Sequence, residues 1–331
     1  MRQKIQKCIQ VGINIYFQRS AVRPRGNYVF LIHGVTSKKH GLYEGKYDNL
    51  QPHIFWEQLR FLQRHFTIVS LLDLFNAAAM GDVTENYCAI TFDDGYKSIA
   101  EEAYPILTDL NIPATVFIIS SIVDDKNYLW RDYVRIVMNE GLESEFINYC
   151  RESYPELSRQ ISDPRTFRGM SRLERGHSSL VFRNALIDFF HQRGKDLRFH
   201  KSKRSLRYYL TADEIRSAPK QVTFGNHTKT HPILTTLNKQ EKEHEISYCQ
   251  KFLAQFDNVV PILSLPSGRA DEESLTIARQ MGYQYVVKHS HSLSAHCDLQ
   301  IGIADRLTMP KTFFDLRWLI SRSHYTPSAV L

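Results

Sequence analysis

The chain has few cysteines, no long hydrophobic run and no visible internal repeat. Its five cysteines, an odd number, are scattered through 331 residues without a C-x-x-C spacing. We therefore expect neither a disulfide framework nor a zinc site built from thiolates. No run of about 18 apolar residues occurs, so no helix that crosses a membrane is expected.

The N-terminal stretch also lacks the features of a signal peptide. Its apolar part, residues 11–17, is interrupted by Asn14 and is followed by no small-residue cleavage site. We expect residues 1–18 to form a packed terminal helix, with an amphipathic membrane anchor as the alternative. A cytoplasmic location follows as an expectation, with peripheral contact to the inner membrane face as the alternative.

Two adjacent carboxylates are present where a strand is expected to end. The segment TFDDGY, residues 91–96, follows the apolar run 87–90, so Asp93 and Asp94 lie at the point where α/β folds collect catalytic groups. Successive side chains on a strand point to opposite sides, which indicates different roles for the two. Alone, Asp-Asp-Gly is usually a solvated turn.

A histidine pair follows a second strand-like run. The segment HTKTHP begins at His227, directly after residues 222–226. If the chain turns helical there, His227 and His231 share one face, four residues apart, as a chelating pair requires. Histidines at this spacing also occur without a metal. Two imidazole nitrogens and a carboxylate oxygen suit zinc or a related divalent ion.

The two motifs together, in this order and each after a strand, resemble the polysaccharide deacetylase family (carbohydrate esterase family four, the chitooligosaccharide deacetylase homology domain). The likeness continues in five further segments. They are a strand that ends in His33 (28–35), a helix (103–107), a strand (112–118), a helix before the histidines (210–215) and SLPSG (264–268). It covers roughly residues 28–122 and 208–312, with one long insertion between them.

The resemblance implies the fold class and the domain organisation. We expect an α/β fold, the distorted (β/α) barrel of this family, over residues 28–320, with a basic helical insertion at about 124–208. A helical segment, 1–27, would precede the barrel and a short tail, 321–331, would follow it. Barrels of this kind commonly exceed about 250 residues as one domain.

The resemblance also implies a role for each motif residue. Asp94, His227 and His231 would hold a divalent metal, with zinc as the expected ion, and the metal would polarise the substrate carbonyl. Asp93 would be the general base that takes the proton of the attacking water. The backbone N–H of Tyr96 would stabilise the resulting oxyanion.

A general acid must also protonate the departing amine. Many family members supply a histidine from a Leu-x-x-His-like element near the C-terminus, which has no clean match here. His289, His291 and His296 lie in a polar stretch that is expected to be a surface loop. We prefer His33, because it follows a strand; the alternatives are that His291 is the acid and that His33 only hydrogen-bonds its loop.

Two further residues are assigned to the substrate site, Pro266 of SLPSG and Arg306. The arginine that many members place before their proline motif, to orient the base, is absent, because residues 263–265 are Leu-Ser-Leu. Arg306 is the candidate to substitute for it.

The insertion concentrates the positive charge of the chain. Residues 151–210 contain fourteen Lys or Arg against six Asp or Glu, a local charge of +8, whereas the whole chain carries +7. Helical spacing of apolar residues at 128–138 and 180–190 predicts helices. The segment is either a solvated helical excursion or an electropositive lip that attracts an anionic substrate or a phospholipid surface. Nucleic acid is not an expected partner, since no known binding module is present.

The predicted function is removal of N-acetyl groups from an amino sugar in a glycan, a lipid-linked sugar or a surface-polysaccharide precursor. A hydrolase of O-acetyl groups or of another small amide on the same site is the alternative enzyme. A catalytically inactive glycan-binding protein is the alternative of a different class.

Overall fold

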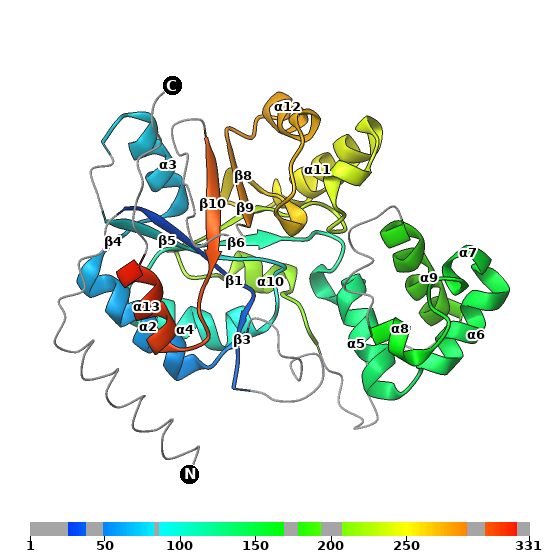
Figure 1. The fold of residues 1–331 in the computed structure, drawn as a ribbon. Helices are drawn as coiled ribbons and strands as arrows, with labels where there is room; N and C mark the ends of the chain where they lie inside the picture. Colours follow the sequence, from blue (N-terminus) through cyan, green and yellow to red (C-terminus); the bar gives the residue numbers. More distant parts are fainter. Residues whose placement is uncertain are drawn as a thin grey trace, which may run out of the picture.

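The centre of the molecule is a closed parallel barrel (Figure 1). The computed structural model describes residues 26–37, 49–82, 86–168, 178–192, 207–289 and 302–322. Seven strands follow one another in the order β1-β10-β9-β8-β7-β6-β5, and β5 pairs back to β1 to close the barrel. All of these pairings are parallel, so the expected distorted (β/α) barrel is confirmed.

The strand bounds are β1 Tyr28–Ile32, β2 Gly34–Val35, β3 Asn49–Leu50, β4 Thr67–Ile68, β5 Tyr87–Phe92, β6 Ala114–Ile118, β7 Val222–Asn226, β8 Val259–Ser264, β9 Tyr285–His289 and β10 Ile303–Thr308. The short β4 pairs with the start of β5, and β2 pairs with β3 outside the barrel.

The helix bounds are α2 Pro52–His65, α3 Leu71–Ala79, α4 Tyr104–Asp109, α5 Trp130–Glu140, α6 Glu143–Ser153, α7 Pro155–Ser158, α8 Pro164–Arg168, α9 Ser178–Gln192, α10 Ala212–Arg216, α11 Lys239–Leu253, α12 Glu272–Gln280 and α13 Phe313–Arg322. Within the described part of the chain, no helix combines the length and the apolar character that a membrane span needs.

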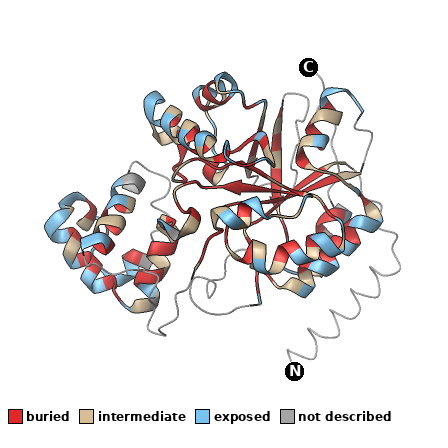
Figure 2. Ribbon diagram, turned by 180° about the vertical axis from the view of Figure 1, so that it is seen from behind, coloured by how far each residue is buried: buried red, intermediate tan, exposed pale blue. Residues whose placement is uncertain are grey.

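The strands are apolar on both sides because both sides are covered. All five residues of β1 are buried, as are all five of β6 (Figure 2). Val29 and Ala89, which are register partners, face a cluster that collects side chains from around the barrel and is covered by α3. The neighbouring pair, Phe30 and Ile90, faces the opposite way, toward α2, α4 and α13. Alternation along each strand thus divides the core into an interior and an outer layer.

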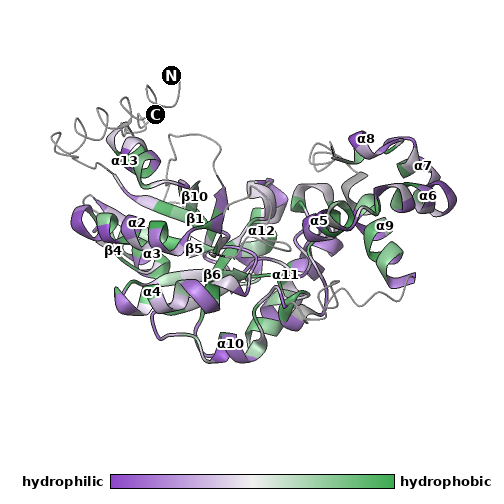
Figure 3. Ribbon diagram, turned by 90° about the horizontal axis from the view of Figure 1, so that it is seen from below, coloured by the Kyte–Doolittle hydropathy of each residue, from purple (hydrophilic) through white to green (hydrophobic). Residues whose placement is uncertain are grey.

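Helices α5 to α9, which fall in the segment predicted as an insertion, form a lobe beside the barrel (Figures 1 and 3). The lobe has its own apolar core, in which Phe146 lies against Phe167, Phe182 and Phe189 with ring centroids 5.3–5.8 Å apart. Figure 3 shows that its helices also carry hydrophilic segments. The expected helices at 128–138 and 180–190 are α5 and α9.

A buried polar cluster joins the lobe to the barrel. Asp132, from α5, is fully buried and accepts hydrogen bonds from Tyr96 and Tyr209 and from Arg135, the last at 2.8 Å. Tyr96 and Tyr209 also form an isolated antiparallel bridge. Because Tyr96 follows the carboxylate motif by two residues, this cluster anchors the lobe next to the expected site.

Candidate metal centre and paired carboxylates

The predicted site residues come together at one end of the barrel. Asp93 and Asp94 follow β5, His227 follows β7, and His33 follows β1. All of these strands run parallel, so their carboxyl ends meet at the same mouth. The register pairs Ile32 with Phe92, which puts His33 beside Asp93 as the two strands end.

Asp94, His227 and His231 form a group that could hold a metal ion. One ligand atom from each lies within 4.8 Å of the others, and all three residues are buried. The Nε2 atoms of His227 and His231 lie 3.6 and 3.7 Å from the same Asp94 oxygen, Oδ1. These separations are too long for hydrogen bonds.

The chemistry of these three side chains fits a divalent ion. Asp94 Oδ1 is buried and has no hydrogen-bond partner among the described residues, a costly state for a carboxylate unless a cation compensates it. The Nδ1 atom of His227 lies 2.8 Å from the carbonyl oxygen of Ser264, which can only accept. Nδ1 therefore carries the proton, and Nε2 presents its lone pair toward Asp94, as metal-binding histidines do.

The pKa values of two of these groups depart from the usual ones because both groups are buried. Burial raises the pKa of Asp94 to about 6. Burial, together with the nearby His227 and Arg131, lowers the pKa of His231 well below its usual value. His231 is therefore neutral at pH 7, the form in which a histidine binds a metal. Asp94, whose pKa is raised, must lose its proton before it can bind one.

The histidine pair does not lie on a helix, so that expectation was wrong. Residues 227–230 have no helical structure, and Thr228 and His231 have positive φ angles of 68° and 61°. Side-chain hydrogen bonds hold this unusual loop: Thr228 N–H donates to Asn226 Oδ1 at 2.7 Å, and His231 N–H donates to Thr228 Oγ1 at 3.0 Å. A tight loop, rather than a helical face, brings the two rings to 4.8 Å between centroids.

Neighbouring helices support the same loop from both sides. The N–H and hydroxyl of Thr230 donate to the Glu245 carboxylate, from α11, at 2.8 and 2.6 Å. The guanidinium of Arg183, from α9 of the lobe, donates to the Thr230 carbonyl. The residue before His231 is thus bound to the barrel layer and to the lobe.

Arg306 holds Asp93 through both carboxylate oxygens. Its Nη1 and Nη2 atoms lie 2.6 and 2.7 Å from Oδ1 and Oδ2, and Arg306 is completely buried. Nη2 also donates to Ser264 Oγ at 2.8 Å, and Nη1 donates to Thr91 Oγ1 at 3.2 Å. This geometry matches the substitution expected for the missing base-orienting arginine, whereas burial behind Asp93 leaves Arg306 no direct access to a substrate.

The two adjacent carboxylates have opposite pKa shifts. Burial alone would raise the pKa of Asp93, but the charges of Arg306 and His227 outweigh it and hold this pKa well below its usual value. For Asp94, burial outweighs the charges of Arg131 and His227, so its pKa is raised. Asp93 is therefore ionised at neutral pH, and the guanidinium fixes the orientation of its carboxylate.

Two other predicted residues are close to this centre. The charge of His33 contributes to the lowered pKa values of Asp93 and His231, and the side chain is half-buried. The bridge between Tyr96 and Tyr209 uses the N–H groups of Lys97 and Leu210. Among the described residues, the backbone N–H of Tyr96 has no hydrogen-bond acceptor assigned to it.

Pro266 is buried directly after β8, and its segment packs on the end of β9. Gly268 has a positive φ of 66°, and a Cβ atom there would lie 2.6 Å from the His289 carbonyl oxygen, so only glycine fits. His289 itself ends β9 and lies 2.9 Å from Thr308 Oγ1, so its assignment to a surface loop was wrong. His291 and His296 lie outside the described residues.

Sequence reasoning missed four residues that support the site, Thr91, Asp132, Glu245 and Ser264. Ser264 could have been found, because it ends a parallel strand as the other site residues do. Asp132 and Glu245 carry no comparable signal, because each is distant in the chain from the residue that it contacts. Asp132 lies 36 residues from Tyr96, and Glu245 lies 15 residues from Thr230.

A model of the family described as polysaccharide deacetylase matches residues 80–161 and 186–286, which is more than half of the chain. The match reaches residue 161, so the first part of the segment predicted as an insertion aligns with the family. The match begins at residue 80 and ends at residue 286, so 28–79 and 287–312, where the sequence also resembles the family, lie outside it.

Individual relatives are distant. YxkH of Bacillus subtilis (strain 168), whose name assigns it provisionally to the polysaccharide deacetylases, is 32% identical over 62 residues. That segment spans 19% of this chain and only 22% of the relative.

Two solved structures share the fold at low identity. The first is the Streptococcus pyogenes deacetylase PplD in complex with acetate, with a TM-score of 0.55 at 15% identity over 86% of this chain and 93% of that one. The second is a de-N-acetylase from Aggregatibacter actinomycetemcomitans, with a TM-score of 0.54 at 15% identity over 89% of this chain and 99% of that one.

We predict that the purified chain binds one divalent ion and that His231→Ala lowers the affinity more than about 100-fold, beyond the usual effect of losing only a supporting partner. Affinity should fall as the pH drops below about 6, because the ion must then displace the proton of Asp94, whose pKa burial raises to about 6. Calorimetric titration in buffers of different ionisation enthalpy measures both quantities. His244→Ala is the matched control, since His244 is an exposed histidine outside the group. Equal affinities for the parent and His231→Ala would contradict the site.

We predict that Arg306→Gln destabilises the protein by about 3–5 kcal/mol at pH 7, because it leaves the Asp93 charge buried without its partner. The double variant Asp93→Asn, Arg306→Gln should lose less than the single one, since no charge is then left unpaired. Urea unfolding of the metal-free variants measures this. The loss of stability caused by Arg306→Gln should shrink as the pH falls. Once the guanidinium is gone, burial raises the pKa of Asp93, and protonation then removes the uncompensated charge. A loss that is equal in the single and double variants would contradict this account.

Proposed function

The chain belongs to the polysaccharide deacetylase family, and from that premise we propose that it is a metal-dependent hydrolase that removes N-acetyl groups from an amino sugar of a glycan or glycan precursor. One observation carries the proposal. A buried carboxylate oxygen of Asp94, to which no described residue donates a hydrogen bond, faces two histidine nitrogens. It lies next to the Asp93 carboxylate, which Arg306 keeps ionised.

Asp94, His227 and His231 would hold the metal, and we propose zinc on the basis of the donor set. When bound, such an ion would polarise the acyl oxygen of the substrate and make a water molecule easier to deprotonate. The remaining work falls to the side chains and backbone of the chain.

Asp93 is the proposed general base. Its carboxylate lies 3.6 Å from His227 Nε2, so it adjoins the metal group. Both of its oxygens are already bound by Arg306, which distinguishes it from Asp94. It takes a proton from water as the water oxygen attacks the carbon of the acetamide. Arg306 keeps Asp93 ionised and oriented, at some cost in basicity, because a lowered pKa makes a weaker base. The backbone N–H of Tyr96 donates to the oxyanion that forms.

His33 is the proposed general acid. Cleavage of the C–N bond requires a proton on the nitrogen, and His33 is a titratable group at the same mouth of the barrel, half-buried and beside Asp93. The products are acetate and a free amine. Pro266, at the end of β8, is proposed to line the substrate site. The alternative candidate for the general acid is His291.

The family supports an acetylated glycan as the substrate class, and the finer choices are proposals. One structural neighbour is a de-N-acetylase, which favours N-acetyl over O-acetyl groups. A cytoplasmic location, with peripheral membrane contact as the alternative, would favour a precursor over a finished polymer. An O-deacetylase, another small-amide hydrolase and an inactive glycan-binding protein are the competing readings.

We predict that the metal-loaded chain releases acetate from N-acetylated amino sugar oligomers and that Asp93→Asn and His33→Ala each lower kcat by about 10²–10⁴-fold. Metal affinity should stay close to that of the parent, because neither residue is a ligand in this mechanism. Coupled acetate assays and metal titrations on the same preparations measure the two effects. Full activity of His33→Ala would transfer the acid role to His291 or to water, and parent protein without acetate release would favour the glycan-binding alternative.

We predict a salt dependence if the basic segment steers an anionic or membrane-linked substrate. The relevant residues are Arg165, Arg168, Arg172, Arg175, Lys201, Lys203 and Arg204, of which the last five lie outside the described residues. Higher ionic strength should raise KM and leave kcat almost unchanged, because exposed charges are screened beyond about 8–10 Å at physiological salt.

A neutral short oligosaccharide is the control for this prediction, since its KM should not respond to salt. Charge reversal at three or four of the basic residues should abolish the salt dependence of KM for an anionic substrate. A reversed variant with the KM and salt response of the parent would show that the segment is a solvated structural excursion.

A further inference from the structure

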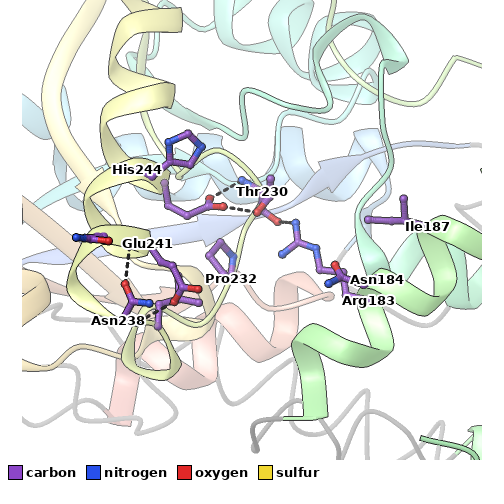
Figure 4. A pocket seen from close by; sticks show the side chains of 11 residues that line it. Arg183, Asn184, Ile187, Thr230, Pro232, Asn238, Glu241 and His244 are labelled. Atoms are coloured by element: carbon purple, nitrogen blue, oxygen red, sulfur yellow. Dashed lines mark hydrogen bonds between the residues drawn. The ribbon is translucent and has the colours of Figure 1, made fainter. Parts of the chain in front are cut away.

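A pocket of about 600 Å³ lies between the lobe and the barrel layer (Figure 4). Arg183, Asn184 and Ile187 of α9 line one side. The other side is lined by the loop after the metal ligands and by the start of α11, with the residues Thr230, Pro232, Leu237, Asn238, Gln240, Glu241, His244 and Glu245. A volume of this size is typical of small-molecule sites, which span roughly 300–1,000 Å³.

The pocket adjoins the metal group through the chain itself. Thr230 and Pro232, both in its wall, are the residues on either side of His231. Arg183 crosses from the lobe to donate to the Thr230 carbonyl, and Figure 4 shows this bond in the middle of the wall. A molecule that occupies the pocket therefore lies against the same loop that presents His231.

The lining provides hydrogen-bonding groups that no other described residue uses. The amides of Asn184 and Gln240 make no hydrogen bond to any other residue that the structure describes. Asn238 uses its Oδ1 to accept the Glu241 N–H at 3.0 Å, which leaves its NH₂ group for a ligand. Amides that both donate and accept suit hydroxyl groups, which do the same.

The charges and apolar residues of the lining favour a neutral ligand. Glu241 and Glu245 contribute two negative charges against the one positive charge of Arg183. An anionic group would be repelled by this balance, although the lobe as a whole lies in a basic segment. Ile187, Pro232 and Leu237 add the apolar surface against which the C–H faces of a sugar ring pack.

We propose that this pocket binds a neutral sugar residue of the substrate, a neighbour of the amino sugar whose N-acetyl group is removed. The assignment rests on the proposed function for its substrate class and goes beyond it in placing a second recognition site between α9 and the loop of the metal group. The pocket makes the enzyme selective for a chain of sugars over a single one.

The test measures how affinity depends on substrate length. Calorimetry would follow binding of N-acetylglucosamine and of its oligomers of two to five sugars, in both β-1,4 and β-1,6 linkage. The protein is the metal-loaded full chain with Asp93→Asn, so that the bound probe is not consumed. We expect an oligomer to bind about tenfold more tightly than the single sugar. Adding Asn184→Ala with Gln240→Ala should remove that gain, as expected for the loss of two hydrogen bonds, and should leave the affinity for the single sugar unchanged.

Gln255→Ala is the matched control, because Gln255 is an exposed amide outside the pocket. No gain with length in either linkage, or a gain that survives the double substitution, would overturn the proposal. An equal loss for the single sugar and the oligomers would also overturn it, since the substitutions would then act on the deacetylation site.

Acetate release by the chain without Asp93→Asn separates this proposal from the proposed function. If acetate is released but the pocket substitutions do not change how affinity depends on oligomer length, only the pocket assignment fails. If the pocket-dependent gain is present but no oligomer yields acetate, the hydrolase assignment fails and the sugar site stands.

Discussion

The bidentate pair between Arg306 and Asp93 is the interaction on which this site depends. Two adjacent carboxylates are buried in an apolar barrel, and neither could remain charged there without compensation. Arg306 compensates one of them through two hydrogen bonds and is itself held by Ser264, by Thr91 and by the Phe117 ring, 5.2 Å from the guanidinium carbon. The other carboxylate, Asp94, is left for a cation. The opposite pKa shifts of the two aspartates therefore depend on where this one arginine lies.

Backbone conformation separates the same two side chains. Asp93 ends the extended strand with its N–H bonded to the Ile32 carbonyl, whereas Asp94 has a positive φ of 70°. Positive φ values are unusual for residues other than glycine, although aspartate tolerates them better than most. The turn directs Asp94 toward the two histidines and leaves Asp93 against the guanidinium. Adjacent residues thereby have different partners and opposite pKa shifts.

Much of this could be predicted from the sequence, and the failures have physical causes. Asp93, Asp94 and His227 follow apolar runs, and parallel strands necessarily bring their ends together. The i,i+4 spacing of His227 and His231 fits both a helix and a loop. The loop is selected by hydrogen bonds in which the side chains of Asn226, Thr228 and Glu245 accept backbone N–H groups. Arg306 could be named as a candidate but not placed, because 213 residues separate it from Asp93. Its contact depends on barrel closure, which no local pattern encodes.

The hydrogen bond from Arg183 to the Thr230 carbonyl connects two bodies with separate cores, the lobe and the barrel. A movement of α9 away from the barrel must break this bond and free one side of the loop that carries His231. Any such movement would couple the lifetime of a bound ion to the frequency with which the lobe opens. Metal exchange kinetics would report on a domain motion that an equilibrium affinity averages away.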